Sequence, residues 1–193
     1  MLDAAETLFL REGYLATSMD EVAALAQVSK QTIYTHFGSK EALFVELVSS
    51  MTTAAGDTVH FESAEPQNAD DLAPFLRSYA ERQLATVLAP RLLSLRRLVI
   101  GEVARFPDLA KALFDNGPRR AMSSFASVFE RLATRGLLTI ADPQTAASSF
   151  NWLVMGAPLN EAMLLGDASI PSRDEQRAHV TEAVRIFLAG HRG

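Results

Sequence analysis

A short polar segment, residues 29–40, carries the side chains best suited to recognise another molecule. It reads SKQTIYTHFGSK and contains no aspartate or glutamate, although the whole chain has 23 acidic residues and a formal net charge of −5. Lysine, glutamine and threonine side chains of this kind read base edges in a DNA groove, and hydroxyl groups contact phosphate oxygens. The composition of this segment therefore favours nucleic-acid binding, in contrast to the acidic charge of the whole chain.

The same segment is predicted to be a helix with one buried stripe. Ser29 is a favourable N-cap and Gly38 a favourable C-terminal glycine. Ile33 and Phe37 lie one helical turn apart and would anchor the helix. The outward positions are then Lys30, Gln31, Thr32, Tyr34, Thr35 and His36. Threonines and an aromatic ring reduce helix propensity, so their use here favours recognition; a solvated surface of chance composition is the alternative.

Two further helices must position this segment. Apolar residues recur at helical spacing from Leu2 until Gly13 ends the first helix. Ser18 and Glu21 have the spacing of a capping box and begin the second. The residues AQVS separate that helix from the polar segment, which predicts a helix-turn-helix.

The remaining sequence predicts an all-α protein with about nine helices. Longer periodic segments cover 71–88, 91–106, 119–135, 143–165 and 174–189. Asp142 before Pro143 is a cap followed by a proline at the first helical position. Pro107 is expected to end one helix, the residues NGP at 116–118 to break the chain, and Pro158 to kink the helix in which it lies.

Several classes of function are disfavoured. The chain has no cysteine, its four histidines are scattered, and it has no G-x-S-x-G motif, so we expect neither an enzyme nor a metal or other cofactor. The longest uncharged run, 143–160, contains two prolines and several polar residues and predicts a buried helix rather than a membrane span. Charged residues near the N-terminus argue against a signal peptide, and we expect a cytoplasmic protein.

Residues 1–48 resemble the DNA-binding domain of the TetR family of transcriptional regulators. The motifs G-Y-x-x-T-S, V-A-x-x-A-x-V-S-K and T-I-Y-x-H-F-x-S-K-E-x-L occur here in that order. The resemblance implies a helix-turn-helix DNA-binding domain over residues 1–48. It also implies a helical ligand-sensing and dimerisation domain over residues 49–193, with the fourth helix shared across the boundary.

The resemblance implies roles for individual residues. Those expected to face the major groove are Lys30, Gln31, Thr35 and His36. Tyr34 would contact the backbone or a thymine methyl, and phosphate contacts would come from Thr17, Ser18, Thr32 and Lys40, aided by the N-terminus of the second helix. Alternatives remain, because Thr17 can serve only the turn, Ser18 only the cap, and His36 only the surface.

The second domain is expected to pair with a copy of itself and to bind a small molecule. Residues 150–167 resemble a helix of AcrR- or AefR-like regulators, and the predicted dimer contacts are Phe150, Leu153, Ala157, Val180, Val184, Phe187 and Leu188. Candidate ligand contacts are Glu102, Arg105, Phe125, Phe129, Asn151, Trp152 and Met155. The apolar members can instead be core residues, and Glu102 and Arg105, three residues apart, can form an ion pair.

The resulting hypothesis is a homodimeric repressor that binds a palindromic double-stranded operator and is released by a small, mostly apolar effector. One alternative is an architectural or division-associated DNA-binding protein that acts through a protein partner without a metabolite. The other is an enzyme or carrier that has lost DNA binding. Many relatives carry a basic arm before the first helix; either such an arm is missing here, or affinity depends more on the third and fourth helices.

Overall fold

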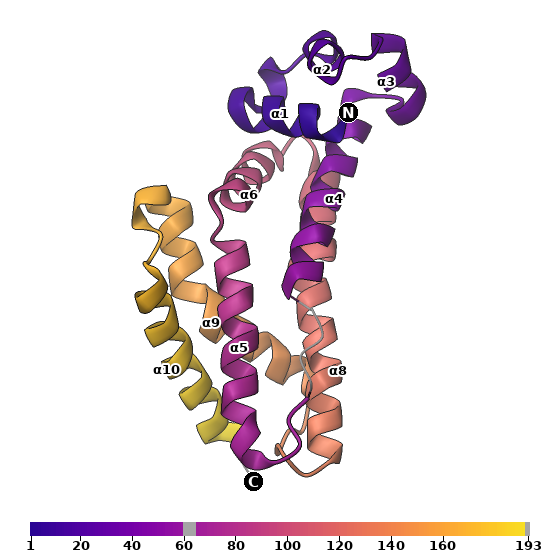
Figure 1. The fold of residues 1–193 in the computed structure, drawn as a ribbon. Helices are drawn as coiled ribbons and strands as arrows, with labels where there is room; N and C mark the ends of the chain where they lie inside the picture. The colour runs from indigo at the N-terminus through magenta and orange to yellow at the C-terminus, as the bar shows by residue number, and fades with distance from the viewer. Residues whose placement is uncertain (60–64, 192–193) are drawn as a thin grey trace. The chain divides into compact units, whose positions relative to one another are not determined.

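The computed structural model describes residues 1–59 and 65–191, and all regular structure within them is helical. The α-helices are α1 (Leu2–Ala16), α2 (Met19–Ala26), α3 (Lys30–Phe37), α4 (Lys40–Val59), α5 (Ala69–Val87), α6 (Pro90–Glu102), α7 (Pro107–Phe114), α8 (Arg120–Thr134), α9 (Pro143–Leu165) and α10 (Arg173–His191) (Figure 1). A π-helical turn, Asp115–Arg119, joins α7 directly to α8, and a 3-10 turn, Asp167–Ser169, follows α9. With α7 and α8 taken as one continuous helix, the described residues contain nine helices, and the all-α prediction is confirmed.

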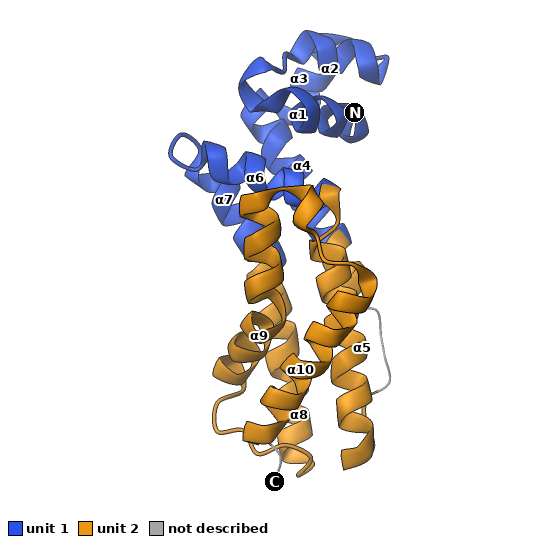
Figure 2. Ribbon diagram, turned by 90° about the vertical axis from the view of Figure 1, so that its left-hand side faces the viewer, with its two compact units in different colours: residues 1–54, 91–117 blue, residues 55–90, 118–193 orange. Residues whose placement is uncertain are grey.

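The chain divides into two compact units (Figure 2). Unit 1 comprises Met1–Ala54 and Arg91–Gly117, and unit 2 comprises Ala55–Pro90 and Pro118–Gly193. Helix α4 contributes residues to both units. This division differs from a single boundary after residue 48, because the chain returns to unit 1 for most of α6 and for α7.

Local signals in the sequence account for the first three helices, which lie together in unit 1 (Figure 1). Ser18 and Glu21 form the predicted capping box: the Ser18 backbone N–H donates to Glu21 Oε2 at 2.9 Å, and the Glu21 N–H donates to Ser18 Oγ at 3.2 Å. Ser29 caps α3 by accepting from the Thr32 N–H at 3.0 Å. Between α2 and α3, Gln27 adopts a left-handed conformation with φ 56°, which makes the turn tight.

Aromatic rings form the centre of the unit 1 core. Phe9 and Phe44 are fully buried with ring centroids 4.7 Å apart, and Tyr14 lies 5.2 Å from Phe44. Helix α1 contains a kink at Gly13, whose φ of 84° is accessible to glycine at little cost. The kink precedes Tyr14, whose ring meets Phe106, the residue before α7, edge to face at 4.6 Å. Through these contacts α1, α4 and the start of α7 share one core.

Unit 2 is a bundle of α5, α8, α9 and α10. Helix α9 packs against α5, α8 and α10, and α10 also packs against α5. Asp142 caps α9 by accepting from the Gln144 N–H at 3.0 Å, with Pro143 at the first helical position as predicted. The interior holds a set of contacting aromatic rings, Phe125, Phe129, Phe150 and Phe187, of which Phe129 and Phe187 stack at 4.9 Å.

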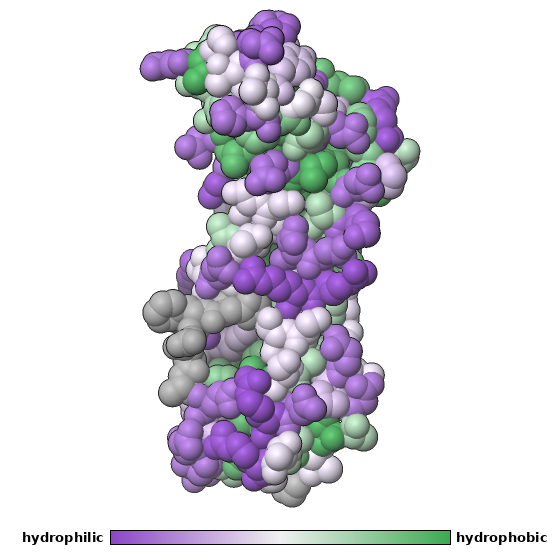
Figure 3. All heavy atoms as spheres, turned by 90° about the vertical axis from the view of Figure 1, so that its right-hand side faces the viewer, coloured by the Kyte–Doolittle hydropathy of each residue, from purple (hydrophilic) through white to green (hydrophobic). Residues whose placement is uncertain are grey.

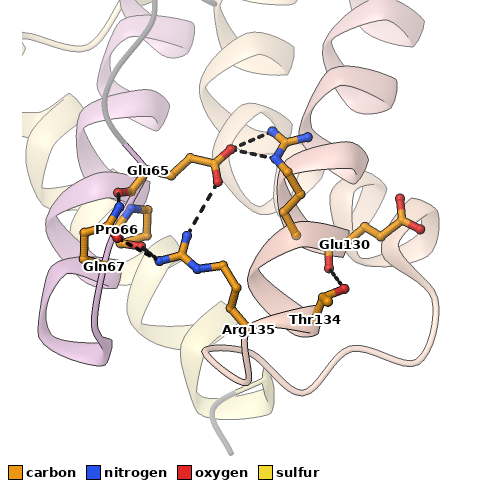
Figure 4. Close-up of polar contacts among 7 residues, drawn as sticks. Glu65, Pro66, Gln67, Glu130, Thr134 and Arg135 are labelled. Atoms are coloured by element: carbon orange, nitrogen blue, oxygen red, sulfur yellow. Dashed lines mark hydrogen bonds and ion pairs between the residues drawn. The ribbon is translucent and has the colours of Figure 1, made fainter.

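Glu65 fastens the segment before α5 to the C-terminal part of α8 (Figure 4). Its carboxylate accepts from Nε and Nη2 of Arg131 at 2.8 and 2.6 Å and lies 3.7 Å from Nη1 of Arg135. Arg135 Nη2 also donates to the Pro66 carbonyl oxygen at 2.7 Å. We call Glu65, Arg131 and Arg135 the Glu65 clasp.

One predicted break is wrong. The residues NGP at 116–118 lie inside the π-helical turn, so the chain remains helical from Pro107 to Thr134. A π-helical turn moves the backbone hydrogen bonds to a wider spacing, and this accommodates Pro118 without ending the helix. Helix α9 continues through Pro158, and the kink expected at that residue stays a prediction.

The surface mixes residue types. Figure 3 shows hydrophilic and hydrophobic residues interspersed on the face that it presents. Among the described residues, none of the helices combines the length and apolar character that a membrane span requires.

Candidate nucleic-acid interface

Helix α3 presents one buried and one exposed side within unit 1. Ile33 is fully buried, and Phe37 is half-buried against the unit 1 core. The predicted recognition residues are exposed, except Thr32, which is half-buried; the exposed ones are Lys30, Gln31, Tyr34, Thr35 and His36. The structure therefore brings five of the six predicted outward residues of α3 to one accessible surface, which we call the α3 surface.

The two threonine hydroxyls of α3 already have partners in the helix or at its N-cap. Thr35 Oγ1 donates to the Gln31 carbonyl oxygen at 2.8 Å, and the hydroxyls of Thr32 and Ser29 share a hydrogen bond at 2.8 Å. A hydroxyl that donates within the helix keeps its lone pairs, and its methyl group remains free for apolar contact.

Lys30 is paired with an acid that sequence reasoning missed. Its Nζ donates to Asp20 Oδ2 of α2 at 2.8 Å, and this hydrogen bond raises the pKa of Lys30. Both side chains are exposed, so solvent screens the pair. Asp20 lies ten residues earlier on another helix, and no local pattern in the sequence indicates the pairing.

Lys40, the first residue of α4, is held against the end of α1. Its Nζ lies 4.6 Å from the ring centroid of Tyr14 and donates to the Leu15 carbonyl oxygen at 3.3 Å. Partial burial lowers the pKa of Lys40, and the carboxylates of Glu102 and Glu21 oppose that shift. Tyr14 follows Gly13, where the sequence predicts the end of the first helix, and its role as a platform for Lys40 was not predicted.

The two residues at the start of α2 differ from each other. Ser18 is half-buried, and its hydroxyl takes part in the capping box. Capping is the role named above as the alternative to a phosphate contact. Thr17 has only 1% of its surface exposed, and its Oγ1 donates to the Gly13 carbonyl oxygen at 2.8 Å. Thr17 therefore belongs to the turn and the core, and we leave it out of the α3 surface and its phosphate contacts.

The predicted ligand contacts are divided between the two units. In unit 1, Glu102 and Arg105 form an ion pair at 3.5 Å and line an open groove of about 560 Å³ with Leu15, Gly101 and Ala104. In unit 2, the buried members are Phe125, Phe129, Asn151 and Met155. Trp152 was expected in the same pocket, but 52% of its surface is exposed because it lies on the outer side of α9.

Most of the predicted dimer contacts are core residues of their own chain. Five have at most 5% of their surface exposed: Phe150, Val180, Val184, Phe187 and Leu188. Within the single chain, α5, α8, α9 and α10 bury these five residues among themselves, and their place in a dimer interface stays a prediction. Leu153 is half-buried and Ala157 exposed, so these two remain accessible.

Helices α9 and α10 also carry apolar residues that are not buried in the core of unit 2. Leu153, Ala157 and Leu164 lie on one stripe of α9, because their spacing of four and seven residues follows the helical repeat. Leu164 is 75% exposed, and α10 contributes the exposed Ile186. We call Leu153, Ala157, Leu164 and Ile186 the outer apolar face.

The helix-turn-helix of unit 1 and its exposed α3 surface define the class of DNA-binding regulators. Residues 1–47 match the family described as bacterial regulatory proteins, tetR family. Residues 74–192 match the AefR-like transcriptional repressor, C-terminal domain. The chain therefore belongs to the TetR family of transcriptional regulators, as the motifs in residues 1–48 implied.

Solved structures and curated relatives agree with this assignment. A TetR-family transcriptional regulator from Mesorhizobium loti is 35% identical, with 100% of this chain and 95% of that chain covered and a TM-score of 0.89. The Flavonoid-responsive Regulator FrrA is 30% identical, with 99% and 94% covered and a TM-score of 0.81. The regulator YhgD of Bacillus subtilis is 51% identical over 51 residues, a match that spans 26% of this chain and 27% of that relative.

The family consists of DNA-binding regulators rather than enzymes, and names of repressors occur among the relatives. In residues 1–59 and 65–191, no group of three or more His, Asp or Glu side chains is placed to hold a metal ion.

Proposed function

We propose that the chain is a homodimeric repressor that binds a palindromic operator and releases it when a small, mostly apolar effector binds. The observation that carries this proposal is the α3 surface, where Gln31, Tyr34 and His36 are exposed around the buried anchor Ile33. Such side chains match the edges of base pairs in a major groove. Lys30 would add a further contact in the groove and Lys40 a phosphate contact, and the Ser18 N-cap would add the positive end of α2.

Two features support dimerisation: the charge of the DNA-binding region and the outer apolar face. Residues 1–48 contain three lysines and arginines against seven acids, so a single subunit would bind DNA weakly. Two copies would place two α3 helices in successive major grooves, about 34–36 Å apart. The outer apolar face supports this pairing, because exposed apolar side chains on two adjacent helices gain stability when a second copy covers them.

The effector would act by favouring a conformation in which the two α3 helices no longer match the operator. A ligand shifts such an equilibrium only by its differential affinity for the two states, so tenfold release needs about 1.4 kcal/mol. The aromatic interior of unit 2 supports a mostly apolar effector. Because the similar protein FrrA is named as flavonoid-responsive, aromatic compounds are the first class to test.

Selection of genomic DNA fragments by the purified protein tests the proposal. We expect recovered fragments to share a palindrome, and Tyr34→Ala and Lys40→Ala to weaken their retardation in a gel. Unchanged retardation by both variants would refute the assigned contacts. If the protein binds DNA and no aromatic compound releases it, the result would instead favour an architectural role that depends on a protein partner.

A further inference from the structure

Two buried carboxamides from different helices of unit 2 meet in its interior. Gln83 lies on the inward side of α5, and Asn151 lies on the inward side of α9, with 5% and 7% of their surfaces exposed. Gln83 Nε2 donates to Asn151 Oδ1 at 2.9 Å. Neither side chain is charged, so the pair is a neutral polar site inside an otherwise largely apolar bundle.

This polar site has an acceptor left over. Gln83 Oε1 is fully buried and has no hydrogen-bond partner among the described residues. A buried carbonyl oxygen without a donor costs free energy, and buried polar groups are usually paired. The Oε1 atom therefore marks a position where a donor from outside the chain would be favourable.

Aromatic rings from three helices stack on one another, and two of them stand close along the helices to Gln83 and Asn151. Tyr79, one turn before Gln83 on α5, stacks on Phe125 of α8 with centroids 4.0 Å apart and planes inclined by 19°. Phe125 also stacks on Phe150, the neighbour of Asn151 on α9, at 5.2 Å. A planar aromatic molecule is the kind of ligand that such rings bind in offset stacks.

We propose that Gln83 and Asn151 form the polar end of an effector site for a neutral aromatic molecule with a hydroxyl group. The hydroxyl donates to Gln83 Oε1, while Asn151 holds the Gln83 amide in orientation. This inference rests on the proposed function, because it assigns a ligand class to the sensing unit of a ligand-responsive repressor. A carboxylate would be repelled by the same oxygen, so acidic aromatics are expected to bind more weakly.

Binding must also move the rings. No further ring fits between Tyr79 and Phe125 at a centroid distance of 4.0 Å, so a ligand must displace or re-stack at least one of them. We therefore expect a hydroxylated ligand to change the near-ultraviolet circular dichroism of the protein. The single tryptophan, Trp152, is exposed on α9 and contributes a separate signal.

Calorimetric titration of the full chain with matched pairs of compounds tests the site. The pairs are phenol and anisole, 2-naphthol and 2-methoxynaphthalene, and 4-phenylphenol and 4-methoxybiphenyl, which differ only by methylation of the hydroxyl. In at least one pair we expect the hydroxyl compound to bind about tenfold more tightly, a difference of about 1.4 kcal/mol. The proposal would be overturned if no compound bound, or if the two members of every pair bound equally. Equal binding is also the result expected if a water molecule, rather than the ligand, donates to Gln83 Oε1.

The double variant Gln83→Leu/Asn151→Leu separates recognition from folding. It removes both partners together and leaves no stranded polar atom, so we expect it to unfold at no lower urea concentration than the unmodified chain. The preference for the hydroxyl compound should fall to within about twofold while both compounds still bind. A double variant that keeps the full preference would show that another residue recognises the hydroxyl. Should the double variant not fold, Gln83→Met carries the same test.

The outcome is independent of the operator experiment. If no genomic fragment is recovered and the preference still depends on Gln83, the effector site stands and the repressor assignment fails. If fragments are recovered and no preference is seen, the repressor assignment stands and this site fails.

Discussion

The ammonium group of Lys40 lies 4.6 Å from the ring centroid of Tyr14 and donates to the carbonyl oxygen of Leu15 at 3.3 Å. The first residue of α4 is thereby fixed to the last turn of α1 within unit 1. A cation over an aromatic face is attracted to it and retains its charge. Lys40 is thus a positioned cation rather than a flexible one, which suits a phosphate contact of fixed register.

Lys40→Ala is expected to weaken operator binding and to reduce its dependence on salt. One phosphate contact per subunit contributes about 1 to the slope of log K against log salt, so the dimer should lose about 2. Fluorescence anisotropy at several salt concentrations measures the slope. Lys111→Ala on α7 removes the same charge outside the proposed interface and serves as control. An equal loss in both variants would mean that only net charge matters.

Gln31→Ala is expected to relax sequence preference rather than to abolish binding. Loss of a contact to a base edge costs about 1–3 kcal/mol at one base pair and leaves the phosphate contacts in place. Competition between operators substituted at each position locates the base pair. Ile33→Ala provides the contrast, since removing this buried side chain should lower the free energy of unfolding by about 2–5 kcal/mol. A Gln31 variant with an unaltered preference would remove this residue from the base contacts.

Charges on the outer apolar face are expected to separate the dimer. Ala157→Arg and Leu164→Glu place a charge where a second copy would have to bury it, which an interface tolerates poorly. Sedimentation velocity should show monomers for both variants. The matched control is Ile100→Glu on α6, where the apolar side chain is 54% exposed. Dimers that persist in both α9 variants would place the interface elsewhere.

Removal of the Glu65 carboxylate should destabilise unit 2 modestly. Glu65 contacts Arg131 of α8 and Arg135, the residue that follows α8, whereas Asp174 and Arg177 form a single ion pair on α10. We expect Glu65→Ala to lower the free energy of unfolding by about 0.5–1 kcal/mol and Asp174→Ala by less, because isolated exposed pairs contribute little. Urea titration at low and high salt measures both. Equal effects would show that the clasp is no stronger than an ordinary surface pair.

The capping box of α2 gives a prediction for acid pH. Hydrogen bonds from Ser18 lower the pKa of Glu21 below its ordinary value of 4.5. Because the folded pKa is the lower one, the carboxylate stabilises the fold above pH 4.5, and this contribution is lost as the pH falls through the folded value. Glu21→Gln cannot titrate and should unfold at lower urea than the unmodified chain at pH 7. The two midpoints should converge below pH 4.5, and a constant difference would contradict this account.

Local rules were sufficient for the helix boundaries that depend on a few neighbouring residues. The caps at Ser18, Ser29 and Asp142 are all found where the sequence predicts them. The predicted break at 116–118 failed because helix-breaking residues were assumed to end an α-helix, whereas a π-helical turn accommodates them.

Periodicity identified the apolar stripes but not what covers them. The helical spacing of Val184 and Phe187 is the same whether they lie in a dimer interface or in the core of the chain. Only the packing of α5 and α9 onto α10 assigns them to the core. The pairing of Gln83 with Asn151 joins residues 68 positions apart, so no local pattern predicts it. The α3 surface was accessible to sequence reasoning because anchor and recognition residues lie within one short helix.

Hydroxyl-radical footprinting of the purified protein on a recovered operator shows whether two α3 surfaces contact DNA together. We expect two protected patches related by a two-fold axis, with centres one helical turn or about 34–36 Å apart, and loss of both patches with Tyr34→Ala. A single patch, or protection that Tyr34→Ala leaves unchanged, would contradict the claim that paired α3 surfaces read the operator.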